Sequence, residues 1–322
     1  MFSFKRYTPA DEKAWNEYVA SARNATFLFN RGYMGYHADR FKDHSLLIYV
    51  GNKLHSLLPA HERGEQFCTH GGLTYGGLVM NIHVTVEDVI QLFKELNEYL
   101  WQQGFRRVLY KPVPWVYHQV PSEEDLYPLF WHCHARIVSR DVGTAIALQQ
   151  HYRWRRDRRS CLKRAQQAGV EVVASCDYAR FWEVLTDNLR ERHGVLPVHS
   201  LAEIQMLHDR FPESIRLYEA LYEGEVVAGF VLFLSPNVVH VQYSSASPLG
   251  KKLGAMDLLY DYAINRDFSQ YQYLDIGRST EGDGSVLNTS LVSQKEGFAG
   301  RTICYDTYEW EVQPASHAGI EN

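Results

Sequence analysis

The sequence has no hydrophobic run as long as a membrane-spanning helix, which needs about 18 apolar residues. Residues 1–6 turn polar at once and lack the apolar core of a secretion signal. The 5 cysteines are odd in number and widely scattered, which argues against a disulfide framework and for a reducing compartment. We therefore expect a cytoplasmic protein with no membrane partner.

An excess of positive charge is also missing. The net charge is −5, so any binding of nucleic acid or other polyanions must depend on a local site. Charged residues at 22% and hydrophobic residues at 45% are ordinary for a globular protein. Aromatic residues reach 13%, which favours aromatic-lined clefts as well as aromatic cores.

The same order of elements occurs twice along the 322 residues: helices, an antiparallel meander of three strands, a helix and a strand. A strand–helix–strand step joins parallel strands, so each sheet should be mixed but mostly antiparallel. An internal duplication accounts for the repeat. The expected strands are 45–50, 53–58, 73–80 and 105–110 in the first half, and 215–221, 226–234, 238–244 and 271–276 in the second.

This pattern predicts an α/β (α+β) protein of two tandem domains whose sheets are flanked by helices. We place the first domain at 1–150 and the second at 151–322, with a basic linker helix at 151–166. Whether the last strand returns to the first domain is left open.

Four segments carry a family resemblance. They are residues 29–37 (FNRGYMGYH), 70–77 (HGGLTYGG), 275–280 (DIGRST) and 288–298, which runs from Asn288 to KEGF. Together with the doubled element order, they resemble FemAB-like tandem N-acyltransferases of the GNAT superfamily, including sugar N-acyltransferases of surface-polysaccharide pathways. The tyrosine often found in the last segment of that family is absent here.

The resemblance implies an enzyme that forms an amide; two of the three functions considered follow from it, and the third rests on the basic run at 151–164. The first is an N-acyltransferase that moves an acyl group from acyl-CoA to a nucleotide-linked amino sugar in O-antigen or capsule biosynthesis. The second is a Fem-like aminoacyl-tRNA-dependent peptidyltransferase acting on a cell-wall precursor, although the long helical hairpin of some Fem proteins is missing. The third is a non-catalytic RNA-binding protein, which the net charge of −5 disfavours.

Under the first function, the partners are small molecules and not nucleic acid, and the chain is a monomer or homodimer. In GNAT domains, backbone N–H groups bind the carbonyl oxygen where the fourth strand separates from its neighbour, and this strand resembles residues 238–245 here. The following turn runs into a helix N-terminus with two lysines, which suits a pyrophosphate; an ordinary strand-to-helix turn is the alternative. The expected acyl-CoA-binding residues are Gln242, Ser244, Ser245, Gly250, Lys251, Lys252, Gly254 and Asn288.

For the acceptor, we expect the glycine-rich segment 70–77 to form a wall of the cleft, although a bulged strand would look the same. Aromatic side chains stack on sugars, and arginines pair with phosphates. The basic run at 151–164 either binds phosphates or is a solvated helix face. The expected substrate-binding residues are Arg31, Tyr33, Tyr36, His37, Tyr75, Lys111, Arg153, Arg156, His199 and Arg278.

No single residue stands out as the base. Carboxylates after a strand end can accept a proton from the ammonium group, directly or through water. The expected catalytic residues are His70, Tyr243 and Glu281. The chemistry could equally rely on positioning and water. No metal site is expected, because His132 and His134 have no matching second cluster of ligands.

Overall fold

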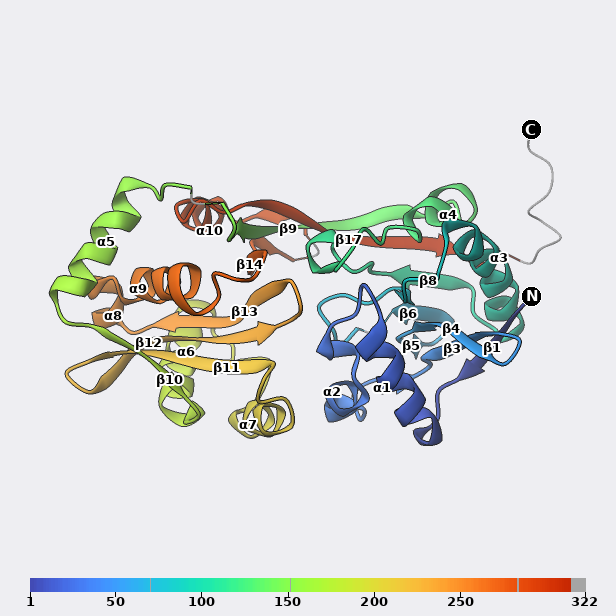
Figure 1. Ribbon diagram of the computed structural model, residues 1–322, viewed down its shortest axis with the longest axis horizontal. Helices are drawn as coiled ribbons and strands as arrows, with labels where there is room; N and C mark the ends of the chain where they lie inside the picture. Colours follow the sequence, from blue (N-terminus) through green and yellow to red (C-terminus); the bar gives the residue numbers. More distant parts are fainter. Residues whose placement is uncertain (70, 151, 283, 314–322) are drawn as a thin grey trace. The chain divides into compact units, whose positions relative to one another are not determined.

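The computed structural model describes residues 1–69, 71–150, 152–282 and 284–313, and these form two compact units. Unit 1 contains Met1–Asp141, Gly282–Ser285 and the chain from Cys304 onward; unit 2 contains Val142–Glu281 and Val286–Ile303. Two strands, β9 (Arg136–Ala147) and β17 (Arg301–Glu311), therefore contribute residues to both units (Figure 1). None of the helices in the described residues is both long and apolar enough to cross a membrane.

Unit 1 contains an antiparallel sheet of order β1–β3–β4–β7. A second set of strands runs in the order β17–β8–β6–β5–β2, in which the pairing of β6 with β8 is parallel. The strands are β1 (Phe2–Arg6), β2 (Lys42–Asp43), β3 (Leu46–Val50), β4 (Lys53–Leu58), β5 (Ala60–Arg63), β6 (Gln66–Thr69), β7 (Val79–Met80) and β8 (Arg107–Tyr110). The helical elements are η1 (Pro9–Asp11), α1 (Glu12–Ser21), η2 (Phe27–Phe29), α2 (Arg31–Met34), η3 (Gly35–His37), α3 (Val86–Gln102), η4 (Trp115–Tyr117) and α4 (Leu126–Trp131).

Helix α3 shows how the sequence specifies unit 1. The side chain of Thr85 accepts a hydrogen bond from the backbone of Asp88, and the Asp88 carboxylate accepts one from the backbone of Thr85 in return. Apolar residues at helical spacing then place one face of α3 in the core, where Val89, Phe93 and Leu100 are fully buried.

Unit 2 has its strands in the order β10–β11–β12–β13–β14–β9, in which the pairing of β13 with β14 is parallel. The strands are β10 (Glu171–Ser175), β11 (Ile215–Tyr222), β12 (Glu225–Leu234), β13 (Val238–Ala246) and β14 (Tyr273–Arg278), with a small hairpin of β15 (Thr280–Glu281) and β16 (Val286–Leu287). The helical elements are α5 (Arg156–Gln167), α6 (Tyr178–His193), α7 (Leu201–Arg210), α8 (Pro248–Leu253), α9 (Ala255–Tyr262), η5 (Ala263–Asp267) and α10 (Thr289–Glu296).

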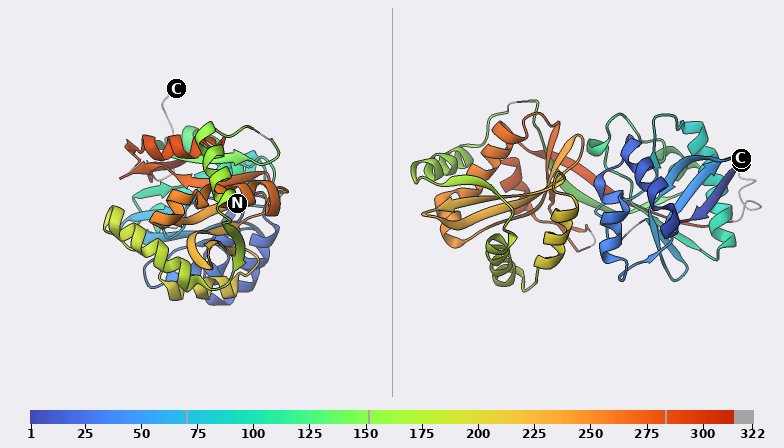
Figure 2. Two further views of the ribbon diagram at one scale, coloured as in Figure 1. Left: turned by 90° about the vertical axis from the view of Figure 1, so that its left-hand side faces the viewer. Right: turned by 60° about the horizontal axis from the view of Figure 1, so that its bottom comes forward.

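Two helices cover opposite faces of the sheet in unit 2 (Figure 2). The face with α9 holds the main core, in which Leu259 packs with Val239 and Val241 of β13. The other face meets α6, where a Cβ on Gly229 of β12 would approach Phe181 to 2.6 Å. Side chains alternate along a strand, so a residue's place in β13 decides which helix it meets.

The glycine-rich segment of unit 1 departs from the expected strand at 73–80. Within residues 73–80, the structure assigns strand only to Val79–Met80, which pairs with β4, while β5 and β6 form a hairpin in the other set of strands. Gly77 has a φ of +82°, and Gly72 lies so close to His37 that a Cβ would approach the ring to 1.9 Å. Glycine at these positions permits a tight turn and close packing, which overrides the strand pattern of the apolar residues.

Candidate functional site

Strands β13 and β14 separate partway along their length. Their parallel pairing covers Val238–His240 against Tyr273–Asp275 and stops there. On the other side of β13, Val231 pairs with Tyr243 and Leu232 pairs with Val241, so Gln242 is the extra residue of a β-bulge. We call the point after His240 and Asp275 the fork. Beyond it, β13 has no ladder pairing with β14.

A histidine and a carboxylate meet at the fork. Nδ1 of His240 lies 2.8 Å from Oδ2 of Asp275, whose side chain is fully buried. The other oxygen of Asp275 accepts a hydrogen bond from the backbone N–H of Gly277 at 2.8 Å. Gly277 has a φ of +74°, a conformation that favours glycine. Both oxygens of the buried carboxylate are therefore held by partners, which fixes the orientation of the imidazole.

Lys295 lies beside this pair. Its Nζ donates to the carbonyl oxygens of Gly277, at 2.9 Å, and Arg278, at 2.8 Å. Burial lowers the pKa of Lys295 to about 8, and the negative charge of Asp275 opposes this shift. Lys295 belongs to the 288–298 segment, but sequence reasoning did not single it out, because its contacts are to backbone atoms of a distant strand.

Tyr243 and His199 form a second polar pair in unit 2. The backbone N–H of His199 donates to the hydroxyl of Tyr243 at 3.1 Å, and Nδ1 of His199 also hydrogen-bonds that hydroxyl. The ring of Tyr243 packs against Trp182 of α6 with centroids 5.2 Å apart. Tyr243 therefore points to the α6 face of the sheet.

The bulge brings the two pairs to the same face. His240 lies between Val239 and Val241, which point into the core with α9, so alternation places His240 on the α6 face. In a regular strand, residues three positions apart lie on opposite faces. The extra residue Gln242 reverses this, so that Tyr243 shares a face with His240.

The turn expected to bind pyrophosphate is closely packed. A Cβ on Gly250 would lie 2.0 Å from the carbonyl oxygen of Val227, and one on Gly254 would lie 2.4 Å from that of Cys161 in α5. Lys251 and Lys252 belong to the last turn of the short helix α8, and Nζ of Lys251 donates to Oδ1 of Asn188. Helix α5 therefore covers one side of this turn.

A buried acid occupies the first turn of α9. Asp257 is 4% exposed, and its carboxylate lies 3.2 Å from the guanidinium of Arg158 in α5. Burial raises the pKa of Asp257 to about 6, despite the opposing attraction of Arg158. This carboxylate lies in the helix turn where an anionic ligand was expected.

The other residues predicted in unit 2 lie in several places. Oγ of Ser245 donates to the carbonyl oxygen of Val184 in α6, while Ser244 is exposed. Asn288 caps α10 and donates to Glu281 at 2.8 Å. Exposed residues that sequence reasoning expected to bind substrate are Arg153, Arg156 and Arg278.

Most residues predicted in unit 1 are parts of its core. The guanidinium of Arg31 lies 3.4 Å from the ring centroid of Tyr7 and 3.9 Å from that of Trp15, and it pairs with Asp43. This stacking explains a buried arginine without a phosphate ligand. Tyr33, His37 and Tyr75 are also buried, Tyr36 and Lys111 are partly exposed, and His70 lies outside the described residues.

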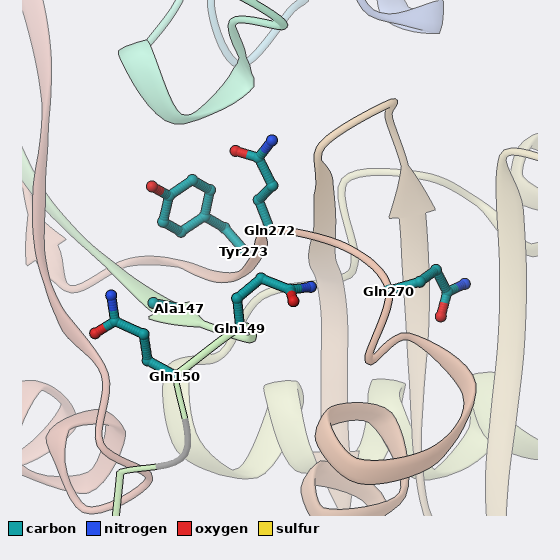
Figure 3. Close-up of a pocket in the computed structure, with 6 residues that line it drawn as sticks. All are labelled: Ala147, Gln149, Gln150, Gln270, Gln272 and Tyr273. Atoms are coloured by element: carbon teal, nitrogen blue, oxygen red, sulfur yellow. The ribbon is translucent and has the colours of Figure 1, made fainter.

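An open depression of about 520 Å³ lies elsewhere in unit 2, beside the start of β14 (Figure 3). Its lining consists of Ala147, Gln149, Gln150, Gln270, Gln272 and Tyr273. Nε2 of Gln149 already donates to two carbonyl oxygens of its own unit, those of Ser269 and Tyr271. The depression contains none of the predicted site residues. No group of three or more histidine, cysteine or acidic side chains in the described part of the chain could hold a metal ion.

Comparison with known proteins identifies the domain type. Residues 150–283 match the family model described as "Acetyltransferase (GNAT) domain". Among solved structures, FemX has a TM-score of 0.69 at 10% identity, covering 96% of this chain and 97% of that one. L-PGS from Bacillus licheniformis has a TM-score of 0.61 at 13% identity, covering 94% and 92%. A tandem GNAT protein from the clavulanic acid biosynthesis pathway has a TM-score of 0.52 at 11% identity, covering 100% of both chains.

These matches confirm two expectations from the sequence. The fold is that of tandem GNAT-like domains with mostly antiparallel sheets flanked by helices, and the GNAT match supports an acyltransferase. A FemAB-like fold is likewise supported. No curated protein matches the sequence significantly. Because the structural matches have low identity, they establish the fold, and the substrates have to be argued from the site.

Proposed function

We propose that the chain transfers an aminoacyl group from aminoacyl-tRNA to an amine of a cell-wall precursor. The observation that carries the proposal is the close packing of the turn before α9. An acyl-CoA donor would need a site for its pyrophosphate at this turn. Helix α5 lies against Gly254, and the carboxylate of Asp257 is buried in the first turn of α9. The carboxylate of Asp257 lies 3.2 Å from the guanidinium of Arg158, so this arginine is already paired and is not available to a diphosphate.

Helix α5 also offers a reason to favour a large polyanionic donor. Arg156, Arg159 and Lys163 recur at helical spacing and are exposed. Arg155 and Arg158, in contrast, are paired with Asp157 and Asp257. A row of exposed cations at this spacing suits a nucleic-acid backbone, which binds through many phosphate contacts.

The residues near the fork can support attack on the ester of such a donor. The amine nitrogen forms a bond to the carbonyl carbon, and the bond from that carbon to the ribose oxygen breaks. The backbone N–H groups of β13 after the fork, where its pairing with β14 has ended, would bind the oxyanion. The hydroxyl of Tyr243 then gives a proton to the departing ribose oxygen, which is a poorer leaving group than a thiolate.

A second candidate is the transfer of an acyl group from acyl-CoA to a nucleotide-linked amino sugar in surface-polysaccharide synthesis. The match of residues 150–283 to an acetyltransferase model favours this candidate. It requires the pyrophosphate to bind away from the turn at Gly254. A non-catalytic RNA-binding role finds no support beyond the basic face of α5, since the same match indicates an acyltransferase.

A donor comparison tests the proposal. Bulk tRNA charged with radiolabelled amino acids and radiolabelled acetyl-CoA are offered separately with nucleotide-linked peptidoglycan precursors and with nucleotide-linked amino sugars. We expect label to move from charged tRNA to the peptidoglycan precursors and not from acetyl-CoA. Transfer from acetyl-CoA alone would show that the second candidate is correct. Uncharged tRNA, added in excess, should compete with the charged donor, which serves as the control for specific binding.

A further inference from the structure

Asp275 fixes the tautomer of the His240 imidazole at the fork. Asp275 is fully buried and holds Nδ1 of His240 at 2.8 Å, so the imidazole donates its Nδ1 proton to a carboxylate. Nε2 is then the acceptor nitrogen of the neutral ring. Among the residues that the structure describes, no hydrogen bond to Nε2 is found. The pair therefore presents a proton acceptor with a fixed tautomer.

The position of the pair matches the place where the acceptor amine must arrive. His240 and Asp275 are the last paired residues before the fork, and the ladder pairing of β13 with β14 ends directly after them. The bulge at Gln242 places Tyr243 on the same face of the sheet as His240. A carbonyl group bound at the edge of β13 would thus have Tyr243 on the side of its leaving group, and His240 beside the attacking nitrogen.

We propose that His240 is the general base of the reaction and that Asp275 is its positioning residue. An amine is protonated at neutral pH and cannot attack until it loses a proton. Nε2 of His240 takes this proton, the neutral amine attacks the carbonyl carbon, and the C–O bond of the ester breaks. The nitrogen loses its second proton to solvent as the amide forms, and Tyr243, which gave its proton to the leaving oxygen, regains one from solvent. The first proton passes from His240 to solvent.

Other charged groups near the pair set the conditions for this role. On β14, Asp275 contacts the ring directly, and the exposed Arg278 lies three positions further along. On α10, Lys295 donates to backbone carbonyls of β14 and feels the charge of Asp275. On β13 and the loop before α7, the pair of Tyr243 and His199 shares a hydrogen bond. Asp275 keeps its hydrogen bond to Nδ1 of His240 while Nε2 holds the transferred proton.

The inference rests on the amide-forming reaction proposed above but not on the identity of the donor. A test that distinguishes deprotonation from structural support uses two acceptor amines. Ethanolamine is protonated at pH 7, whereas methoxyamine is neutral and needs no base. Wild type, His240→Gln and Asp275→Asn are assayed with each amine, using charged bulk tRNA and acetyl-CoA as alternative donors. His208→Gln is the matched control, because Nδ1 of His208 also has an acceptor in unit 2, the carbonyl of Ile215, but lies on α7 away from the fork.

We expect His240→Gln to lower kcat with ethanolamine by about 10²- to 10⁴-fold, which is the usual contribution of a general base. With methoxyamine, the loss should be less than about tenfold, because the proton transfer is no longer needed. The ethanolamine rate of the variant should also rise with pH, as free amine accumulates. Asp275→Asn should show the same pattern with a smaller loss, provided that its thermal unfolding matches that of wild type.

Equal losses with the two amines would overturn the proposal, because a residue that only supports the fold affects both reactions alike. Unchanged rates for His240→Gln with ethanolamine would overturn it too. If wild type uses acetyl-CoA and not charged tRNA, the proposed donor is wrong, but the ratio of the two amine rates still decides the role of His240. If Asp275→Asn does not fold, His240→Gln alone provides the answer.

Discussion

At the scale of single residues, Asp257 is a buried acid whose ionisation opposes folding. Its pKa rises from 3.8 to about 6 on burial, so between these values the folded chain binds more protons than the unfolded chain. Stability from this group is therefore present below pH of about 4 and is lost as the pH rises through about 6. The difference between the two pKa values corresponds to a loss of about 3 kcal/mol at most in the free energy of unfolding.

Asp257→Asn should remove this pH dependence. We expect the variant to unfold at higher urea concentration than wild type at pH 7 and at about the same concentration at pH 4. Burial also raises the pKa of Asp125 in unit 1 to about 7, so part of the decline with pH will remain in both proteins. The difference between the two proteins, measured at each pH, isolates Asp257. A variant less stable than wild type at pH 7 would mean that the ion pair with Arg158 outweighs burial.

Tyr243 provides a prediction about the leaving group. Tyr243→Phe removes the hydroxyl that accepts the backbone N–H of His199, which should lower stability by about 1–3 kcal/mol. It should also slow transfer from an oxygen ester more than transfer from a thioester, because a thiolate leaves without a proton. Rates with aminoacyl-tRNA and with an acyl thioester, measured on the same preparation, provide the comparison. Equal slowing of both reactions would assign Tyr243 a purely structural role.

Some residues of the candidate site could be selected from the sequence, and others could not. Sequence reasoning selected Tyr243, His199 and Gln242, which the structure brings to the bulge, because strand position and residue type are visible in the chain. It did not select His240 or Lys295. His240 and Asp275 are separated by 35 positions, and they meet only through the parallel pairing of two strands. Arg31 was expected to bind phosphate, but its aromatic partners Tyr7 and Trp15 could not be recognised as such from spacing.

At the scale of elements, the contact of α5 with the N-terminus of α9 depends on Gly254. This glycine has a φ of +83°, and a Cβ would lie 2.4 Å from a backbone oxygen of α5. Gly254→Ala should cost about 1–2 kcal/mol for the left-handed backbone and about 1–3 kcal/mol more for the displaced helix. Gly224→Ala is a matched control, because Gly224 has the same φ of +83° and nothing within 4 Å of the added Cβ. The measurement is urea unfolding. If both variants lose the same free energy of unfolding, α5 moves away from the added Cβ without a measurable loss of stability.

The exposed face of α5 yields a prediction about the donor. Replacing Arg156, Arg159 and Lys163 with Glu should weaken tRNA binding at low salt by more than tenfold. It should also reduce the salt dependence of binding, because fewer phosphate contacts form and fewer counterions are released from the tRNA. Fluorescence anisotropy of labelled tRNA across salt concentrations measures both effects. The charge-matched control replaces Lys13, Lys53 and Arg63, which are exposed in unit 1. If the two triple variants weaken binding equally, total charge and not α5 explains it.

Local signals predicted many elements correctly. The capping boxes at Thr85 and Ser200 are present at the starts of α3 and α7, and Gly194 ends α6 in the left-handed conformation. These features depend on residues within one turn of each other, which is why the sequence contains them. Of the strand expected at 73–80, only Val79–Met80 is present, because the glycine-rich backbone before it packs closely against His37.

At the scale of the whole molecule, the division into units departs from a simple cut in the sequence. A boundary at 150/151 follows from repeated element order, but unit 1 takes back the chain from Cys304 onward. The pairing of the last strand with β8 shows that it belongs to unit 1, and no residue pattern within the strand itself indicates which unit it joins. In unit 1, β17 pairs with β8, and Trp310 lies opposite Val108.

Trp310 lets the two units be tested separately. Its side chain is 3% exposed, contacts Phe93 and Tyr110, and donates from Nε1 to Asn97 at 2.8 Å. Trp310→Ala should destabilise unit 1 by about 3–5 kcal/mol, the usual cost of removing a buried tryptophan. Hydrogen exchange should therefore become faster in α3 and β8, while β12 and β13 of unit 2 keep their protection.

The neighbouring substitution Glu309→Ala serves as the control for this experiment. Glu309 occupies the next position of β17, and its contacts are with the partly exposed side chains of Gln66 and Arg107. Because side chains alternate along a strand, it points away from the core that holds Trp310, and exchange should change little. If Trp310→Ala instead accelerates exchange in β12 and β13 as much as in α3, the units unfold as one cooperative body. The stability of the reaction site in unit 2 would then depend on a tryptophan in unit 1.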